Sequence, residues 1–232
     1  MSRLLLAAFS GLFVLSALVA VPAGADDGVS LFDGKTLEGW RGRSDLWSVE
    51  DGAIVGRTTA DDPIKNNTFL IWGGEVPASF ELRLSYRIED GNSGIQYRSR
   101  VADEDNFVVG GYQADIEASN NYTGINYEER GRGILAQRGE RVTIDAEGGR
   151  EVEKFGDAAE IAKSFRADGW NEYRVVASGN RLQHFINDTL TSEVIDGQSD
   201  KAAKSGVIAL QLHVGPPMVV KFKDITVRAI GE

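Results

Sequence analysis

Three polar side chains alternate along one short stretch of this chain, and two of them are acids. The stretch GYQADIE, residues 111–117, carries Gln113, Asp115 and Glu117 at every second position. Side chains two apart on a β-strand point to the same face of a sheet, so a strand here places the three groups side by side. Two carboxyl groups beside an amide can move protons to and from a bound molecule. A sheet face in contact with water has the same pattern, so this stretch alone leaves both interpretations open.

Polar faces of this kind recur on two other predicted strands. Over residues 94–100, Gln96, Arg98 and Arg100 share one face, and the other face is apolar. Over residues 207–214, Gln211 and His213 share a face opposite isoleucine and leucine. If these strands join the acidic strand in one sheet, their polar faces line a common concave surface.

The segment after the acidic strand adds aromatic, amide and charged side chains at high density. They are Tyr122, Asn126, Tyr127, Glu128, Arg130 and Arg132. Planar hydrogen-bonding groups mixed with aromatic rings suit a sugar, which offers hydroxyl groups around an apolar ring face. The run 128–133 is also compatible with a solvated glycine-rich turn, and it lacks the glycine spacing of a phosphate-binding loop.

Most of the chain alternates apolar and polar residues between glycine-rich turns, which predicts β-strands. The predicted strands cover residues 79–88, 91–99, 106–117, 171–178, 181–188, 206–214 and 219–229. The first two are expected to pair as a hairpin, as are 171–178 and 181–188 across Gly179-Asn180. One short helix is predicted over 156–165. These elements indicate an all-β fold, a two-sheet antiparallel sandwich with one short helix.

The N-terminus has the pattern of a secretory signal peptide. A basic Arg3 precedes an apolar run over residues 4–21 and the small triplet Ala23-Gly24-Ala25, which predicts cleavage after Ala25. A retained membrane anchor is the alternative. No other long apolar segment follows, so one domain over 26–232 without a membrane span is expected. The sequence contains no cysteine, which favours a bacterial periplasmic or extracellular protein over a eukaryotic secreted one.

Composition excludes several classes of function. The formal net charge of −10 argues against nucleic-acid binding. The two histidines, His184 and His213, lie on different predicted strands and no cysteine is present, so no zinc site is expected. Asp103, Glu104 and Asp105 offer calcium ligands on a loop, without a diagnostic spacing. No other cofactor is expected.

Six motifs follow one another in the order of a known family. They are LFDGKTLEGWRG (31–42), W-x-V-x-D-G-A-I-V-G (47–56), NSGIQYRSR (92–100), GYQADI (111–116), WNEYRVVASGNRLQHFIND (170–188) and GVIALQLHVGPPMVVKFKDITVR (206–228). In these motifs the chain resembles the 3-keto-disaccharide hydrolase family over essentially all of residues 26–232. The resemblance implies a concanavalin A-like jelly roll that acts on a small glycoside oxidised at carbon 3.

The resemblance also implies a mechanism and a set of site residues. A ketone at carbon 3 acidifies the proton on carbon 2, so a base can remove that proton while the glycosidic oxygen leaves carbon 1. Gln113 stands where many family members have Glu, so Asp115 is the expected base and Glu117 the second choice. Arg98 and His213 complete the expected catalytic set. The expected sugar-binding groups are Gln96, Gln113, Tyr127, Glu128, Arg130, Arg132, His184 and Gln211.

Two other functions are compatible with the same strand. Laminarinase-like glycosidases share the jelly roll and use acids at alternating positions, but retaining hydrolysis needs two carboxyl groups about 5 Å apart. Gln113 occupies the place of one of them. A non-catalytic carbohydrate-binding module is the second alternative, because a fold by itself does not determine a function.

Overall fold

The structure is a computed structural model that describes residues 28–231, and two β-sheets contain nearly all of its regular elements. The first sheet contains β1 (Val29–Ser30), β3 (Trp47–Glu50), β4 (Ala53–Thr58), β6 (Phe80–Ile88), β11 (Glu140–Ile144), β12 (Arg150–Lys154), β13 (Asn171–Ser178), β14 (Arg181–Ile186), β15 (Thr189–Asp196) and β17 (Met218–Ala229). Its strand order is β12-β11-β15-β14-β13-β6-β17-β4-β3, and β1 pairs with β17.

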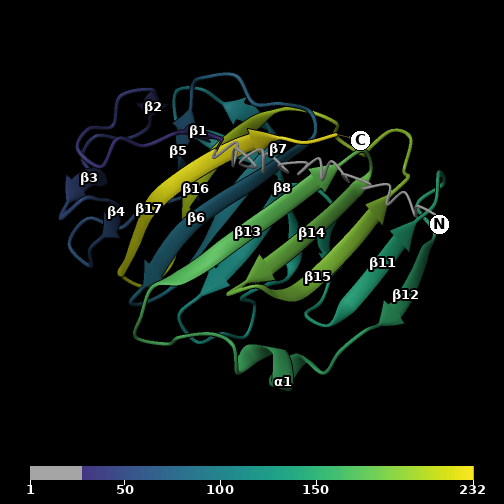
Figure 1. The fold of residues 1–232 in the computed structure, drawn as a ribbon. Coiled ribbons are helices and arrows are strands. Elements are labelled where there is room, and N and C mark those ends of the chain that lie inside the picture. Colours follow the sequence, from purple (N-terminus) through teal and green to yellow (C-terminus); the bar gives the residue numbers. More distant parts are fainter. Residues whose placement is uncertain (1–27, 232) are drawn as a thin grey trace, which may run out of the picture.

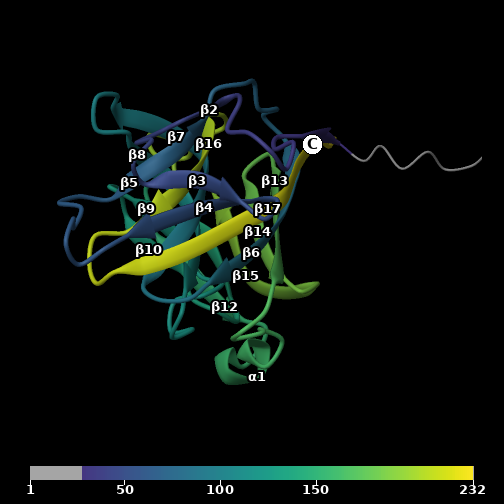
Figure 2. The same ribbon diagram turned by 90° about the vertical axis from the view of Figure 1, so that its left-hand side faces the viewer.

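The second sheet has seven strands and carries the polar faces predicted above. Its members are β2 (Trp40–Arg41), β5 (Thr68–Trp72), β7 (Asn92–Asp103), β8 (Val108–Glu117), β9 (Asn126–Glu129), β10 (Gly133–Ala136) and β16 (Val207–Leu212). Their order is β10-β9-β8-β7-β16-β5-β2, so the acidic strand β8 is an interior strand with a neighbour on each side. Figures 1 and 2 show the two layers, with the short helix α1 (Ala158–Ala162) at one end. The all-β jelly-roll sandwich with one short helix is therefore confirmed.

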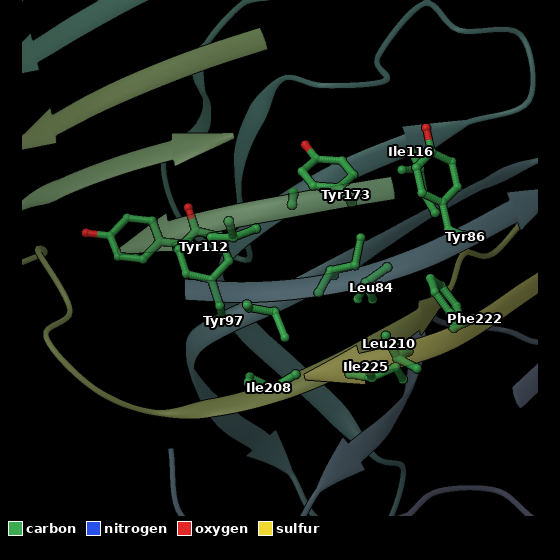
Figure 3. Packing of buried hydrophobic residues seen from close by; sticks show 14 of the residues in the cluster. Leu84, Tyr86, Tyr97, Tyr112, Ile116, Tyr173, Ile208, Leu210, Phe222 and Ile225 are labelled. Atoms are coloured by element: carbon green, nitrogen blue, oxygen red, sulfur yellow. The ribbon is translucent and has the colours of Figure 1, made fainter. Parts of the chain in front are cut away.

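The two sheets face each other because their strands bury every second residue. On β6 the burial alternates without a break, and Phe80, Leu82 and Leu84 all point into the core. The opposite sheet supplies Tyr97 and Tyr112, whose rings stack with their centroids 5.6 Å apart. Figure 3 shows these two rings among aliphatic side chains from both sheets.

Two details of strand pairing differ from the sequence-based expectation. The segments β6 and β7 do not form a hairpin, because β6 pairs with β13 and β17 whereas β7 pairs with β8 and β16. Each strand has one apolar face, and placing them in opposite sheets lets both faces pack against each other. The pairing is antiparallel except between β11 and β15, which run parallel. The expected hairpin of β13 and β14 is confirmed.

The outer face of the seven-stranded sheet is also partly covered. Phe69, Ile71, Val109 and Ala209 form a small apolar cluster there, separate from the main core. Gln211 lies opposite Phe69 in the ladder between β16 and β5. The predicted polar side chains Gln96, Gln113, Asp115 and Gln211 lie next to this apolar cluster and are buried. They are therefore not part of a solvent-exposed sheet face.

The predicted signal peptide, residues 1–25, lies outside the described residues. Within residues 28–231, no helix is long and apolar enough to cross a membrane. The predicted helix over 156–165 is shorter than expected, and its first turn is capped by Asp157, which accepts hydrogen bonds from two backbone N–H groups.

Candidate active site

A pocket of about 310 Å³ opens on the outer face of the seven-stranded sheet, where β7 and β9 begin and β8 ends. Its lining combines carboxyl, amide, aromatic and imidazole groups: Asn67, Asn92, Gln113, Asp115, Tyr122, Ile125, Tyr127, Glu129, Ile134 and His213. The volume is at the lower end of the range of about 300–1,000 Å³ seen for small-molecule sites. Four of these residues (Gln113, Asp115, Tyr127 and His213) belong to the site set predicted from the sequence.

Asp115 lines this pocket with a carboxyl group that is almost fully buried, since only 6% of the residue's surface is exposed. Burial raises the pKa of its carboxyl group to about 7, although hydrogen bonds from Gln113 and Asn92 oppose the shift and the charge of Glu129 adds to it. A carboxyl group that titrates near neutral pH can take up a proton and release it again under ordinary conditions. This is the property expected of a general base.

A network of three glutamines holds Asp115 in place. The Gln113 carbonyl oxygen accepts hydrogen bonds from Gln96 at 2.6 Å and from Gln211 at 3.0 Å. Its amide nitrogen is then left to donate to Oδ1 of Asp115, at 2.7 Å. Ser99 in turn donates to Gln96. The glutamines were predicted to bind sugar, but Gln96 and Gln211 are fully buried beneath the pocket and orient Gln113 instead.

Gly94 makes this network possible, and its replacement is a sensitive test. Gly94 pairs with Asp115 in the ladder, and a Cβ there would lie 2.5 Å from Cγ and Cδ of Gln113. In Gly94→Ala, we expect Gln113 to move and its hydrogen bond to Asp115 to weaken, so the acidic limb of kcat/KM should shift to higher pH. A pH–rate profile measures this shift. Gly231→Ala is the control, because its Cβ meets no atom within 4 Å. An unchanged profile in Gly94→Ala would remove the positioning role of Gln113.

His213 and Glu129 occupy the side of the pocket next to β16 and β9. Nδ1 of His213 lies 2.6 Å from the carbonyl oxygen of Val214, which can only accept, so Nδ1 carries a proton. In the neutral ring Nε2 then has the lone pair. Glu129 accepts hydrogen bonds from Asn67 and Gln211 at 3.2 and 3.3 Å. The strand-face prediction for His213 agrees with its position in the lining, and its catalytic role stays a prediction.

Glu117 does not line the pocket, although it shares a strand face with Asp115. Its Oε2 accepts the backbone N–H groups of Asn121 and Tyr122, at 2.9 and 3.2 Å, and so fixes the loop after β8. That loop places Tyr122 at the pocket, with 47% of its surface exposed. Glu117 is therefore in a position to support Tyr122 and is poorly placed to act as a second base.

The exposed ring of Tyr122 suits stacking on a sugar ring. In Tyr122→Ala, we expect KM for the substrate to rise by about 5- to 10-fold with a smaller change in kcat, because the ring contributes binding and no proton transfer. Steady-state kinetics check this, with Tyr122→Phe as the matched control that keeps the ring. A loss of kcat at constant KM would assign Tyr122 to the chemical step instead.

Arg98 is not where strand periodicity places it. The ladder of β7 and β8 shifts register between Tyr97 and Arg100, and Arg98 has a φ of 46° at this irregularity. Its guanidinium group donates to the carbonyl oxygens of Ala78 and Gly179, which precede β6 and follow β13 in the other sheet. The prediction that Arg98 and Gln96 share a face is wrong, because the bulge turns the arginine toward the opposite sheet.

His184 lies between the two sheets and has no exposed surface. Its Nε2 is 2.9 Å from the hydroxyl of Tyr97, and its Nδ1 is 3.2 Å from the hydroxyl of Tyr173. Burial lowers the pKa of its imidazole to about 3, so the ring stays neutral. The predicted contact of His184 with substrate is wrong, because His184 shares the core-facing side of β14 with the buried Leu182 and Ile186.

Glu128 and Arg132 point away from the pocket and into a buried ion network. Arg132 pairs with Glu128 at 2.7 Å and with Asp196 at 2.6 Å, and Tyr112 donates to the same aspartate. The sugar-binding role predicted for Glu128 and Arg132 is therefore not supported, since their charges are already neutralised. Arg130 is exposed outside this pocket, in a neighbouring groove.

Asn67, Asn92 and Glu129 line the pocket but were not predicted as site residues. The sequence pattern could have indicated only Glu129. Glu129 is two residues from Tyr127 on β9, so period two places it on the face of Tyr127 and excludes Glu128. Asn67 and Asn92 stand at strand beginnings in different parts of the chain, and only the pairing of β5, β16, β7 and β8 brings them together.

In the loop predicted as a calcium site, the carboxylates of Asp103 and Glu104 already have protein partners. Asp103 accepts the backbone N–H groups of Asp105 and Asn106, and Glu104 pairs with Arg41. Within residues 28–231, no three His, Asp or Glu side chains converge as metal ligands do. A role for calcium stays a prediction that only metal addition and removal can test.

Comparison with known proteins identifies related chains. A family model described as the 3-keto-alpha-glucoside-1,2-lyase-like domain matches residues 27–228. The 3-keto-disaccharide hydrolase of Bacteroides thetaiotaomicron is 34% identical over 85 residues, which are 33% of this chain and 29% of that protein. The match therefore spans less than a third of the length of that relative.

Two solved structures show how widely this fold is used. The carbohydrate-binding module CBM66 from Bacillus subtilis superposes with a TM-score of 0.54 at 15% identity, covering 82% of this chain and 96% of the module. A β-glucanase from Bacillus licheniformis gives a TM-score of 0.50 at 11% identity, covering 87% and 96%. At these identities the likeness concerns the fold alone, and the same sandwich carries both a binding module and an enzyme.

Proposed function

Because this chain belongs to the 3-keto-alpha-glucoside-1,2-lyase-like family, we propose that it cleaves the glycosidic bond of a 3-keto-glycoside by acid–base chemistry in the pocket around Asp115. The observation that carries the proposal is the buried Asp115 carboxyl group, whose pKa burial raises to about 7. The predicted signal peptide adds that the reaction takes place in the periplasm or outside the cell.

The ketone makes this reaction possible with few protein groups. Asp115 removes the proton from carbon 2, and the electron pair of that C–H bond forms a C1–C2 double bond while the bond from carbon 1 to the glycosidic oxygen breaks. The leaving oxygen takes up a proton. Water then adds across the double bond, with its hydroxyl going to carbon 1 and a proton returning to carbon 2, so that the net reaction is hydrolysis.

Other lining groups suit the remaining steps. Negative charge grows on the ketone oxygen during proton removal, and a hydrogen-bond donor there lowers the barrier. Tyr127 fits this role because burial, followed by the charges of Glu129 and Asp115, raises the pKa of its hydroxyl and keeps it protonated. His213 is the proposed donor to the leaving oxygen when both of its ring nitrogens carry a proton, since Nε2–H can then donate while Nδ1 keeps its contact with the carbonyl oxygen of Val214.

The test is turnover of a 3-keto-glucoside beside its unoxidised parent, with and without EDTA. We expect cleavage of the keto sugar only, because the parent lacks the acidic proton on carbon 2. Cleavage of both sugars would favour an ordinary glycosidase using Asp115 and Glu129, and cleavage of neither with binding retained would favour a binding module. Loss of turnover in EDTA, restored by calcium, would add a metal to the proposal.

A further inference from the structure

The loop after β8 brings Tyr122 to the pocket around Asp115, and an arginine outside the pocket holds this loop. Nη1 of Arg138 donates to the carbonyl oxygens of Asn120, at 3.0 Å, and of Thr123, at 2.7 Å. These two carbonyl groups stand on either side of Tyr122 in the chain. Arg138 itself lies in the connection between β10 and β11 and does not line the pocket. It therefore contacts the backbone around Tyr122 without reaching the ligand space.

The guanidinium group of Arg138 binds carbonyl oxygens and an aromatic ring instead of a carboxylate. Among residues 28–231 it forms no ion pair. Its Nε donates to the carbonyl oxygen of Ala158, at 2.8 Å, in the first turn of α1. Its Cζ lies 5.5 Å from the centroid of the Phe165 ring. A guanidinium group presents several N–H donors in one rigid plane, so this single side chain ties the Tyr122 loop to the segment that contains α1.

The backbone next to Arg138 is held firmly. Gly139 has a φ of 85°, and a Cβ there would lie 2.4 Å from the carbonyl oxygen of Gly156. The N–H group of Gly139 donates to the carbonyl oxygen of Thr191, at 2.7 Å, and its own carbonyl oxygen accepts from Phe155 at 2.9 Å. Arg138 therefore extends from a backbone that the neighbouring segments fix, and the loop is held against a rigid support.

The ring of Tyr122 depends on this support because the ring itself has little packing. The residue is 47% exposed, so its position follows from the backbone of its loop. Glu117 holds the loop by its N–H groups at Asn121 and Tyr122, and Arg138 holds it by the two carbonyl groups described above. The two residues therefore fix opposite ends of the peptide units around Tyr122.

From these contacts we infer that Arg138 is a positioning residue for substrate binding, which holds the ring of Tyr122 where a sugar can stack on it. A loop that is ordered before binding loses less conformational entropy when the sugar arrives, and the affinity is correspondingly higher. This inference rests on the proposed function for the position of the sugar, and it assigns part of the affinity to a residue outside the pocket.

The test measures KM on a 3-keto-glucoside and, by calorimetry, Kd for the unoxidised parent sugar. R138Q should raise KM and Kd by about threefold and change kcat by less than about twofold, because the base at Asp115 is unaltered. R138K keeps a charged donor and should give a smaller rise. R166Q is the control, because Arg166 also donates to a backbone carbonyl, that of Trp170, but does not contact the Tyr122 loop. Its KM and Kd should equal those of wild type.

The effect of Arg138 must act through Tyr122. In the Tyr122→Ala background, R138Q should raise KM and Kd no further, since the ring that Arg138 positions is absent. Unchanged KM and Kd in R138Q, or an equal rise in both backgrounds, would overturn the assignment. If R138Q does not fold, the same comparison is made with R138K, whose smaller rise should also vanish in Tyr122→Ala.

The positioning role and the cleavage reaction can fail separately. If R138Q cleaves the keto sugar with the KM of wild type, the positioning role fails and the cleavage proposal stands. If no variant, wild type included, cleaves the keto sugar but Kd rises in R138Q only when Tyr122 is present, the positioning role holds and the cleavage proposal fails.

Discussion

Replacement of Asp115 by asparagine is expected to lower kcat/KM on a 3-keto-glucoside by about a thousandfold while the sugar still binds. Asparagine keeps the size of the side chain and an oxygen that can accept from Gln113, but it cannot take the proton from carbon 2. Loss of a general base lowers rates by about 10²- to 10⁴-fold. Steady-state kinetics and calorimetry with the unoxidised sugar measure the two effects separately.

The pH dependence of wild-type activity should follow the ionisation of the Asp115 carboxyl group. Activity should rise with pH through about 7, because only the ionised carboxylate of Asp115 acts as a base. Glu117→Gln serves as the matched control, since it alters a neighbouring acid that caps a loop instead of lining the pocket. If Glu117→Gln removes turnover and Asp115→Asn keeps it, the base has been assigned to the wrong residue.

Ionisation of Asp115, which the reaction needs, is also expected to lower the stability of the fold. Its pKa is raised from 3.8 to about 7, so the folded state binds this proton more tightly than the unfolded chain. That contribution is fully present below about pH 4 and is lost as the pH rises through about 7. The Asp115→Asn variant has no such loss. Its free energy of unfolding relative to wild type should therefore be higher at pH 8 than at pH 4, which urea denaturation at the two pH values measures.

The largest effect on stability is expected at Arg132. The side chain of Asp196 is 2% exposed, and Arg132→Met would remove the cationic partner of this carboxylate and of Glu128. Removing one member of a buried ion pair costs about 3–5 kcal/mol. We therefore expect the free energy of unfolding at pH 7 to fall by about 3 kcal/mol or more, as determined from urea denaturation.

The pH dependence of that loss has a definite sign. Burial alone would raise the pKa of Asp196, but hydrogen bonds from Arg132 and Tyr112 lower it below its ordinary value. The stabilisation is present above about pH 4 and disappears as the pH falls through the lowered pKa, so the variant and wild type should converge in acid. Arg57→Gln, at an exposed pair, should change stability by less than about 1 kcal/mol. If Arg132→Met raises KM without destabilising the fold, a substrate contact is the better explanation.

Strand periodicity predicted a two-layer sandwich and the polar row from local sequence, although it did not predict which strands share a sheet. Alternation along 79–88 and 111–117 was sufficient because each strand must turn its apolar residues into the core, whatever its neighbours are. The same rule placed Asp115 and His213 on a common face, and both line the pocket. The motif order added the family, which the match over residues 27–228 supports.

Periodicity failed where the tertiary structure breaks or redirects a strand. The bulge near Arg98 turns the side chain of Arg98 toward the opposite sheet. The alternation of residues along this strand does not predict the bulge. Arg132 was predicted to meet a sugar, but Asp196, which lies 64 residues away in sequence, neutralises it. Both errors arise because these arginines contact residues that are distant in the chain, and sequence spacing does not contain that information.

What the sequence by itself determined is therefore the set of residues that share each strand face, together with the class of fold. Only the tertiary structure decided which of these residues line the pocket. The resemblance already made Asp115 the expected base, but only the folded sheet buries its carboxyl group, and this burial, with a smaller contribution from the charge of Glu129, raises its pKa to about 7. Strand order and desolvation are properties of the assembled sheet, and they depend on contacts between residues that are far apart in the chain.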